Sequence, residues 1–107
     1  MMGRLATRIA IITGASSGLG RCISLTLAAE GAAVICADLV PTARPEVAEE
    51  TSMETHELIR QRGGKALFVK ADVGVASDMQ GLVRTAVEWG GRLDMFVAFL
   101  LSYKVFD

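Results

Sequence analysis

The sequence predicts an α/β fold built on a partial, doubly wound parallel sheet, in the order β-α-β-α-β-α-β. Two observations carry this prediction. Four short runs of mostly branched apolar residues occupy 8–13, 33–37, 66–70 and 95–101, and stretches with the apolar spacing of helices separate them. A glycine cluster also follows the first run directly. Strands that alternate with helices imply parallel pairing, right-handed crossovers and helices on both faces of the sheet.

The first half of the chain is expected to form a strand, a helix and a second strand. Residues 8–13 are typical of a strand buried on both faces. A helix should follow Gly18, and Gly31 stands where a C′ glycine belongs. The second strand covers 33–37 and closes at Asp38. The predicted buried face of the helix consists of Leu19, Cys22, Ile23, Thr26 and Leu27.

The second half begins with a loop, because residues 41–50 hold both prolines and several acids. A polar helix is predicted over 51–62, stopped by Gly63 and Gly64, and it places the lone His56 in solvent. Residues 66–70 form the third strand, and 95–101 form the fourth.

The third predicted helix has a capping box, with Ser77 as N-cap and Gln80 reaching back to it. Gly90 and Gly91 end this helix, and Trp89 should cover the core. Its predicted apolar face consists of Met79, Leu82, Val83, Ala86 and Val87.

Composition limits the class of protein. The chain has 107 residues, of which 51% are hydrophobic and 21% charged, with a net charge of −1. One domain fits this length, and intrinsic disorder is excluded. No basic stripe for nucleic acid is present, and no apolar run approaches the ~20 residues of a membrane span. Cys22 and Cys36 lack metal spacing and are expected to be reduced core residues. Without a signal peptide, a cytoplasmic location is expected.

The glycine cluster has the features of a phosphate-binding loop. Gly14, Gly18 and Gly20 give the spacing GxxxGxG between a strand and a helix. Glycine permits a sharp turn and close approach of a pyrophosphate, and the helix N-terminus attracts that anion. Ser16 and Ser17 can add hydroxyl donors. The loop therefore predicts a dinucleotide site.

An acid at the end of the second strand completes that prediction. Asp38 stands eighteen residues beyond Gly20. A carboxylate there can accept hydrogen bonds from both ribose hydroxyls of an adenosine and would repel a 2′-phosphate. The expected cofactor is therefore NAD, with NADP less favoured.

Together these motifs resemble the short-chain dehydrogenase/reductase family. The resemblance is carried by residues 13–20, by Asp38, by Asp72 with Val73, and by residues 91–94. It implies a Rossmann-like fold and cofactor binding by Leu19 of the loop. It also implies that Asp72 contacts the adenine and that Val73 lines the adenine pocket. Ser17 and Leu39 stand where NADP users of the family often carry a basic residue, although Arg44 nearby keeps NADP open.

The resemblance ends near Val97. The family continues with Asn-Asn-Ala-Gly, whereas residues 97–101 read Val-Ala-Phe-Leu-Leu. The family's catalytic Ser, its Tyr-x-x-x-Lys pair, its nicotinamide half-site and its oligomer contacts have no counterpart before Asp107. Tyr103 and Lys104 are adjacent and cannot both face one pocket. We therefore expect residues 1–107 to be one incomplete dinucleotide-binding domain with an atypical tail at 98–107 and no catalytic residues, inactive alone as an oxidoreductase.

Two alternatives remain at this point. The chain could be a non-catalytic nucleotide-binding or interaction module, because half a doubly wound sheet would leave one side of the first and fourth strands uncovered. A methyltransferase-like nucleotide fold also pairs a glycine-rich loop with an acid after the second strand. The glycine spacing and the Asp72–Val73 pair argue against that fold.

Overall fold

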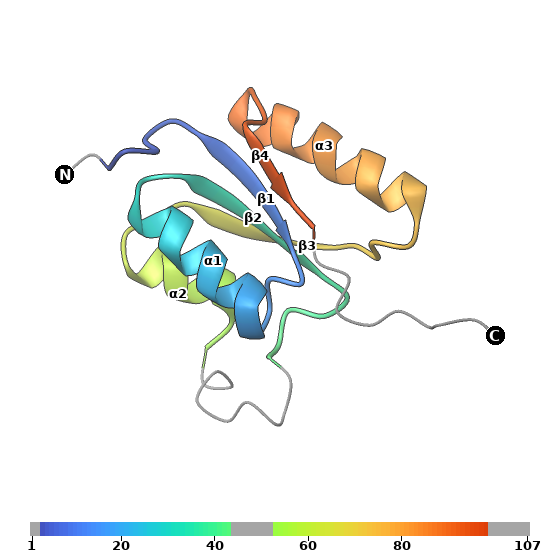
Figure 1. The fold of residues 1–107 in the computed structure, drawn as a ribbon, viewed down its shortest axis with the longest axis horizontal. Helices are drawn as coiled ribbons and strands as arrows, with labels where there is room; N and C mark the ends of the chain where they lie inside the picture. The colour runs from blue at the N-terminus through green and yellow to red at the C-terminus, as the bar shows by residue number, and fades with distance from the viewer. Residues whose placement is uncertain (1–2, 44–52, 99–107) are drawn as a thin grey trace.

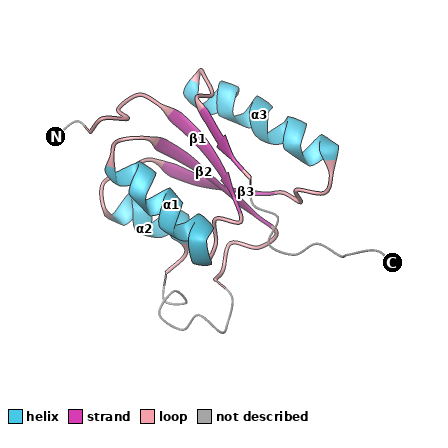
Figure 2. Ribbon diagram, viewed as in Figure 1, coloured by secondary structure: helices cyan, strands magenta, loops and turns pink. Residues whose placement is uncertain are grey.

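The computed structural model describes residues 3–43 and 53–98, which form one parallel sheet flanked by helices (Figures 1 and 2). The predicted order of elements and the α/β fold class are confirmed. The elements are β1 (Ile9–Thr13), α1 (Gly18–Ala29), β2 (Ala33–Asp38), α2 (Thr55–Gln61), β3 (Ala66–Lys70), α3 (Ala76–Gly90) and β4 (Met95–Val97).

The four strands lie in the order β3-β2-β1-β4, and every pairing is parallel. Ile9 is in register with Ala33 of β2, and Ala10 is in register with Met95 of β4. β1 is thus an interior strand, and all five of its residues are buried. The expectation that one edge of the first strand would be uncovered was wrong, because β2 and β4 pair with the two edges of β1. β3 and β4 are the outer strands of this sheet.

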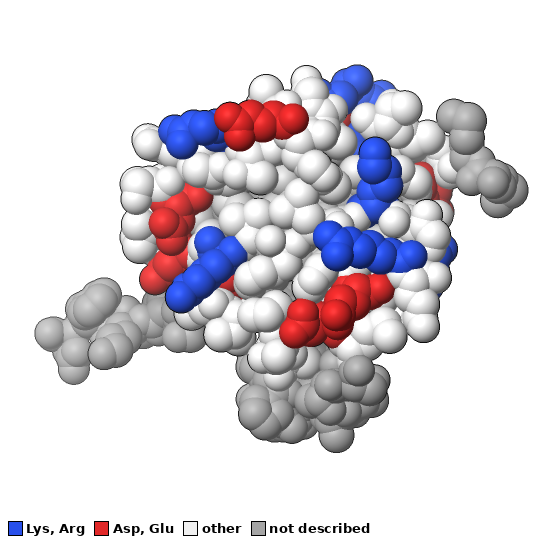
Figure 3. Space-filling model, turned by 180° about the vertical axis from the view of Figure 1, so that it is seen from behind, with Lys and Arg blue, Asp and Glu red and all other residues white. Residues whose placement is uncertain are grey.

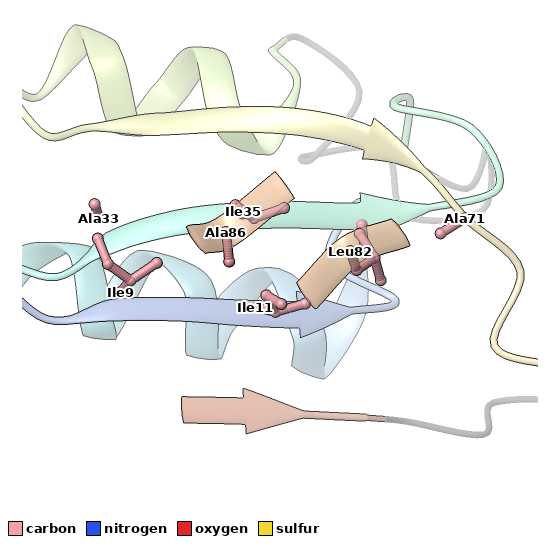
Figure 4. Packing of buried hydrophobic residues seen from close by; sticks show 8 residues of the cluster. Ile9, Ile11, Ala33, Ile35, Ala71, Leu82 and Ala86 are labelled. Carbon is pink, nitrogen blue, oxygen red and sulfur yellow. The ribbon is translucent and has the colours of Figure 1, made fainter. Parts of the chain in front are cut away.

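The two faces of the sheet carry separate hydrophobic clusters. Ile9, Ile11 and Ile35 point to the face covered by α3, where they meet Leu82 and Ala86 (Figure 4). Alternate residues point to the other face, because successive side chains of a strand point in opposite directions. There Ala10, Ile12, Val34 and Cys36 join Ile59 of α2, with partly buried side chains of α1 packed around them. The expected helices on both faces are therefore present.

The buried face of α1 differs from the predicted one. Leu19, Cys22 and Thr26 are exposed, and Ile23 and Leu27 are only partly buried. The fully buried positions are instead Gly20, Arg21 and Ser24. Gly20 lies inward because α1 begins against the backbone of the glycine-rich loop, whereas Arg21 and Ser24 are buried polar residues. Cys22 is thus not a core residue, whereas Cys36 is buried as expected.

The starts of α2 and α3 also differ from prediction. α2 begins at Thr55 after Glu54, and residues 51–52 lie outside the described residues. α3 begins at Ala76 with Val75 in the N-cap position, so the predicted Ser77 cap was wrong. The Asp78 carboxylate accepts a hydrogen bond from the backbone N–H of Asp72 (2.9 Å), which ties the preceding turn to the first turn of α3.

Leu82 and Ala86 are the buried residues of α3, and Met79 and Trp89 pack partly against the same cluster, as expected. Val83 and Val87 are exposed, contrary to prediction. The helix ends at Gly90, and Gly91 takes a left-handed conformation (φ +82°), as the glycine pair predicted.

His56 is not solvated as expected. Its side chain is only 14% exposed, and its ring lies 5.9 Å from the ring of Phe68, measured between centroids. Its Nε2 lies 3.7 Å from a Glu54 carboxylate oxygen.

Several predictions fall outside the described residues. These are the loop at 44–50 with Arg44, the end of the fourth run at 99–101, and the tail with Tyr103 and Lys104. Within the described part, β4 ends at Val97.

No helix in the described ranges has the length and apolar character needed to cross a bilayer. On the face opposite to the view of Figure 1, Lys and Arg side chains are interspersed with Asp and Glu and form no patch of one sign (Figure 3).

Candidate functional site

The turn between β1 and α1 requires glycine at two positions. Gly14 has φ +63° and Gly18 has φ +61°, a left-handed conformation that costs other residues roughly 1–2 kcal/mol. These two glycines reverse the chain at the carboxyl end of β1. Ser17 stands at the N-cap position, so the first turn of α1 begins directly beside the loop.

Gly20 is required by close packing rather than by its backbone angles. A Cβ at this position would lie 2.1 Å from the carbonyl oxygen of Gly14 and 3.1 Å from that of Thr13. The loop thus folds directly onto the first turn of α1. The three glycines of the GxxxGxG spacing therefore shape one turn, two through their conformation and one through close packing.

Three hydrogen bonds join the loop to the end of β2. The Ala15 N–H donates to the Ala37 carbonyl (3.2 Å), and the Ser16 N–H donates to Oδ2 of Asp38 (3.0 Å). The Ser16 hydroxyl donates to the Val40 carbonyl (2.5 Å). The predicted loop and the predicted acid are thus in direct contact, and the hydroxyl of Ser16 holds the loop in place.

Asp38 is partly buried, and its second carboxylate oxygen accepts the Leu39 N–H (2.8 Å). Two backbone donors therefore orient the carboxylate. Each carboxylate oxygen can accept more than one hydrogen bond, so capacity remains for a ligand hydroxyl. Leu39 is 55% exposed next to it and brings no charge.

The turn after β3 reaches the same edge of the sheet. The Ala71 N–H donates to the Asp38 carbonyl (3.0 Å), which places the start of this turn beside the end of β2. Asp72 is exposed, and its carboxylate accepts the Gly74 N–H (2.8 Å). Val73 is partly buried. The structure thus collects the loop, Asp38, Asp72 and Val73 at the carboxyl ends of neighbouring parallel strands, where ligands of open α/β sheets bind.

The arrangement is suited to an elongated anion. The first turn of α1 offers N–H donors and the positive end of a helix dipole to a phosphate. Leu19 is 59% exposed beside this turn. Asp38 offers an acceptor for hydroxyl groups one strand away. No group of His, Cys, Asp and Glu residues able to hold a metal ion occurs within 3–43 and 53–98.

Sequence reasoning missed three residues that support this region. Arg21 and Thr55 are both buried and contact each other, and Thr55 also contacts the loop. The residue pattern around Arg21 and Thr55 carries no signal that the two residues meet. Asp94 was noted only as part of a motif.

Asp94 anchors the start of β1. Its Oδ2 accepts the Ile9 N–H (2.9 Å), and its Oδ1 accepts hydrogen bonds from Arg92 (2.8 Å) and Arg8 (3.3 Å). The Ile9 N–H and the two guanidinium groups hold the pKa of the Asp94 carboxyl below its ordinary value. This carboxylate fixes the strand that leads into the glycine-rich loop.

Comparison with known proteins gives one consistent result. Residues 8–99 match the short chain dehydrogenase family. An uncharacterized oxidoreductase of Methylorubrum extorquens is 41% identical over 96 residues, covering 90% of this chain and 36% of that protein. The 3-hydroxyacyl-CoA dehydrogenase type-2 of Drosophila melanogaster is 38% identical over 89 residues, covering 83% of this chain and 31% of its own length.

A solved structure agrees with these relatives. The crystal structure of a hydroxysteroid dehydrogenase from Escherichia coli superimposes with a TM-score of 0.74 at 30% identity, covering 89% of this chain and 37% of that one. The chain therefore spans about a third of the length of the relatives it matches.

Proposed function

The chain belongs to the short-chain dehydrogenase family, and from that premise we propose that it holds the adenosine and pyrophosphate part of a nicotinamide dinucleotide, with NAD preferred over NADP. The family is NAD(P)-dependent. In the whole protein we propose the oxidoreductase activity of the family, in which the bound dinucleotide supplies hydride transfer. The carrying observation is the contact between Ser16 of the glycine-rich loop and the Asp38 carboxylate.

The pyrophosphate would lie against the loop. A side chain at Gly18 or Gly20 would disturb this surface, the first because of its left-handed backbone and the second because of contact with Gly14. The N–H groups at the start of α1 would donate to the phosphate oxygens. These backbone N–H groups would supply the donors for the pyrophosphate without a further side-chain donor.

The adenosine would lie along the ends of β2 and β3. Asp38, held by the Ser16 and Leu39 N–H groups, would accept the two ribose hydroxyls and repel a 2′-phosphate. Asp72 and Val73 would contact the adenine. Arg44 lies outside the described residues, so the preference for NAD rests on Asp38 and on the uncharged Leu39.

The 107-residue chain alone should bind without catalysing turnover. Hydride transfer requires a fixed nicotinamide ring and a group that moves the hydroxyl proton, and orientation can contribute roughly 7–11 kcal/mol. Tyr103 and Lys104 are adjacent in the sequence, whereas the catalytic pair of the family has the spacing Tyr-x-x-x-Lys. We expect the rate of NADH formation with secondary alcohols to equal the rate without protein. Turnover that saturates with NAD and is lost in Tyr103→Phe would contradict this expectation.

Calorimetry with NAD and NADP tests the cofactor preference. The unmodified chain should bind NAD more tightly than NADP. Asp38→Ala should weaken NAD binding and narrow the ratio of the two affinities, because the repulsion of the 2′-phosphate is removed. Glu88→Ala removes one carboxylate from the exposed surface of α3 and serves as the control for net charge. If Asp38→Ala leaves the ratio of NAD to NADP affinity unchanged, Asp38 has only a structural role in the turn. If the chain binds S-adenosylmethionine in place of NAD, a different class of enzyme is favoured.

A further inference from the structure

The peptide group between Ala15 and Ser16 is held at both ends by buried or partly buried side chains. Its carbonyl accepts the Thr55 hydroxyl (2.7 Å), and its N–H donates to Oδ2 of Asp38 (3.0 Å). Thr55 is the first residue of α2 and is 1% exposed. One rigid peptide plane therefore connects α2 to the acid at the end of β2.

Arg21 supports the α2 side of this connection. Arg21 is only 5% exposed, and its Nη1 donates to Thr55 Oγ1 (3.3 Å) and to the Met53 carbonyl (2.8 Å). Across 3–43 and 53–98, no carboxylate lies within ion-pair distance of this guanidinium. Its acceptors are thus a hydroxyl and a carbonyl. Because Arg21 donates to Thr55, the Thr55 hydroxyl is directed to donate its own proton to Ala15.

We propose that Arg21 and Thr55 are positioning residues that set the orientation of Asp38 through the Ala15–Ser16 peptide. This inference rests on the proposed binding of a dinucleotide at the loop. A rotation of the peptide plane would move its N–H away from Oδ2 and leave Leu39 as the remaining backbone donor to the carboxylate. The pair would therefore tune the discrimination between NAD and NADP although neither residue needs to touch the ligand.

A purely structural role for the pair predicts a different outcome. Loss of stability alone would lower the affinity for NAD and for NADP by the same factor, because it acts on the folded fraction. A change in the orientation of Asp38 alters the ratio of the two affinities. The ratio is therefore the decisive measurement.

The test compares three threonine substitutions in the full 107-residue chain. Thr55→Val keeps the shape of the side chain and removes the hydroxyl, whereas Thr55→Ser keeps the hydroxyl. Thr26→Val is the matched control, because the Thr26 hydroxyl also donates to a backbone carbonyl, that of Cys22 (2.9 Å), on the exposed side of α1. Calorimetry measures NAD and NADP affinities, and hydrogen exchange measures protection of residues 14–18.

Thr55→Val should raise the Kd for NAD on the order of tenfold, raise that for NADP less, and speed exchange at residues 14–18 relative to the rest of the chain. Thr55→Ser and Thr26→Val should keep the affinity ratio and the loop protection of the unmodified chain. Equal ratios and equal loop protection in Thr55→Val and Thr26→Val would overturn the inference.

If Thr55→Val does not fold, Arg21→Lys replaces it, because the ammonium group keeps the charge but not the guanidinium geometry. Failure of both variants to fold would also overturn the inference, since it would assign the pair to fold stability. If the unmodified chain binds neither dinucleotide, the proposed function fails. Loop exchange then still decides whether Thr55 holds the loop.

Discussion

Two helical glycines give opposite predictions for the same substitution. In α3, a Cβ added to Gly81 meets no atom within 4 Å. Alanine is about 1 kcal/mol more favourable than glycine inside a helix, so Gly81→Ala should raise the free energy of unfolding by about 0.5–1 kcal/mol. In α1, a Cβ added to Gly20 lies 2.1 Å from the Gly14 carbonyl oxygen and 2.7 Å from its carbon. Both atoms belong to the backbone, so no side chain can rotate away.

The loop must therefore move by roughly 1 Å or more to reach ordinary contact in Gly20→Ala. Overpacking of this kind costs about 1–3 kcal/mol, which exceeds the gain in helix propensity. A change of 1 kcal/mol shifts the Tm of a domain of this size by roughly 4–8 °C. We expect a lower Tm for Gly20→Ala, a higher Tm for Gly81→Ala, and loss of NAD binding in Gly20→Ala alone.

Thermal unfolding followed by circular dichroism measures the first two effects, and calorimetry measures the third. Gly81→Ala serves as the internal control, because it makes the same chemical change in a helix on the other face of the sheet. A Gly20→Ala chain as stable as Gly81→Ala, or one with unchanged NAD affinity, would refute the packing of the loop against α1.

Three further predictions follow from burial and charge. Leu82→Ala should lower the free energy of unfolding by about 2–5 kcal/mol in urea titrations, because this fully buried side chain fills the cluster under α3. Asp94→Asn should lower stability at pH 7 and flatten the loss of stability in acid. Because the pKa of Asp94 is depressed, the stability that its carboxylate contributes is present above about pH 4 and is lost as the pH falls through the folded-state pKa. An acid-unfolding curve that Asp94→Asn leaves unchanged would exclude the contact with Ile9. Iodoacetamide at pH 8 should label the exposed Cys22 and spare Cys36, because burial raises the pKa of the Cys36 thiol to about 12; mass spectrometry of the folded chain distinguishes the two.

Strand positions were predictable because buried parallel strands are nearly continuous apolar runs. β1, β2 and β3 agree with the sequence to within a residue or two. The inner face of α1 was not predictable from hydrophobicity. Leu19 and Cys22 satisfy the helical period but are exposed, whereas Gly20 lies inward against the Gly14 backbone and the polar Arg21 and Ser24 are also buried. Proximity of backbone to backbone leaves no signature in an apolar pattern.

The candidate site was predictable where backbone conformation demands glycine. Gly14 and Gly18 need a left-handed backbone, and their spacing revealed the loop. The support for the loop was not predictable in the same way. Thr55 contacts Ala15 from 40 positions along the chain, and a buried arginine on α1 has the same sequence appearance as an exposed one.

The order of the strands has a consequence for how the chain folds. β1 and β2 pair across the short span of α1, so the glycine-rich loop can form from early, local contacts. The pairing of β1 with β4 must wait until almost the whole described chain is available, since Ile9 and Asp94 are 85 positions apart. During synthesis the loop would therefore be shaped before the far edge of β1 is closed. Substitutions that disturb the loop should slow folding, whereas substitutions at Asp94 should chiefly speed unfolding.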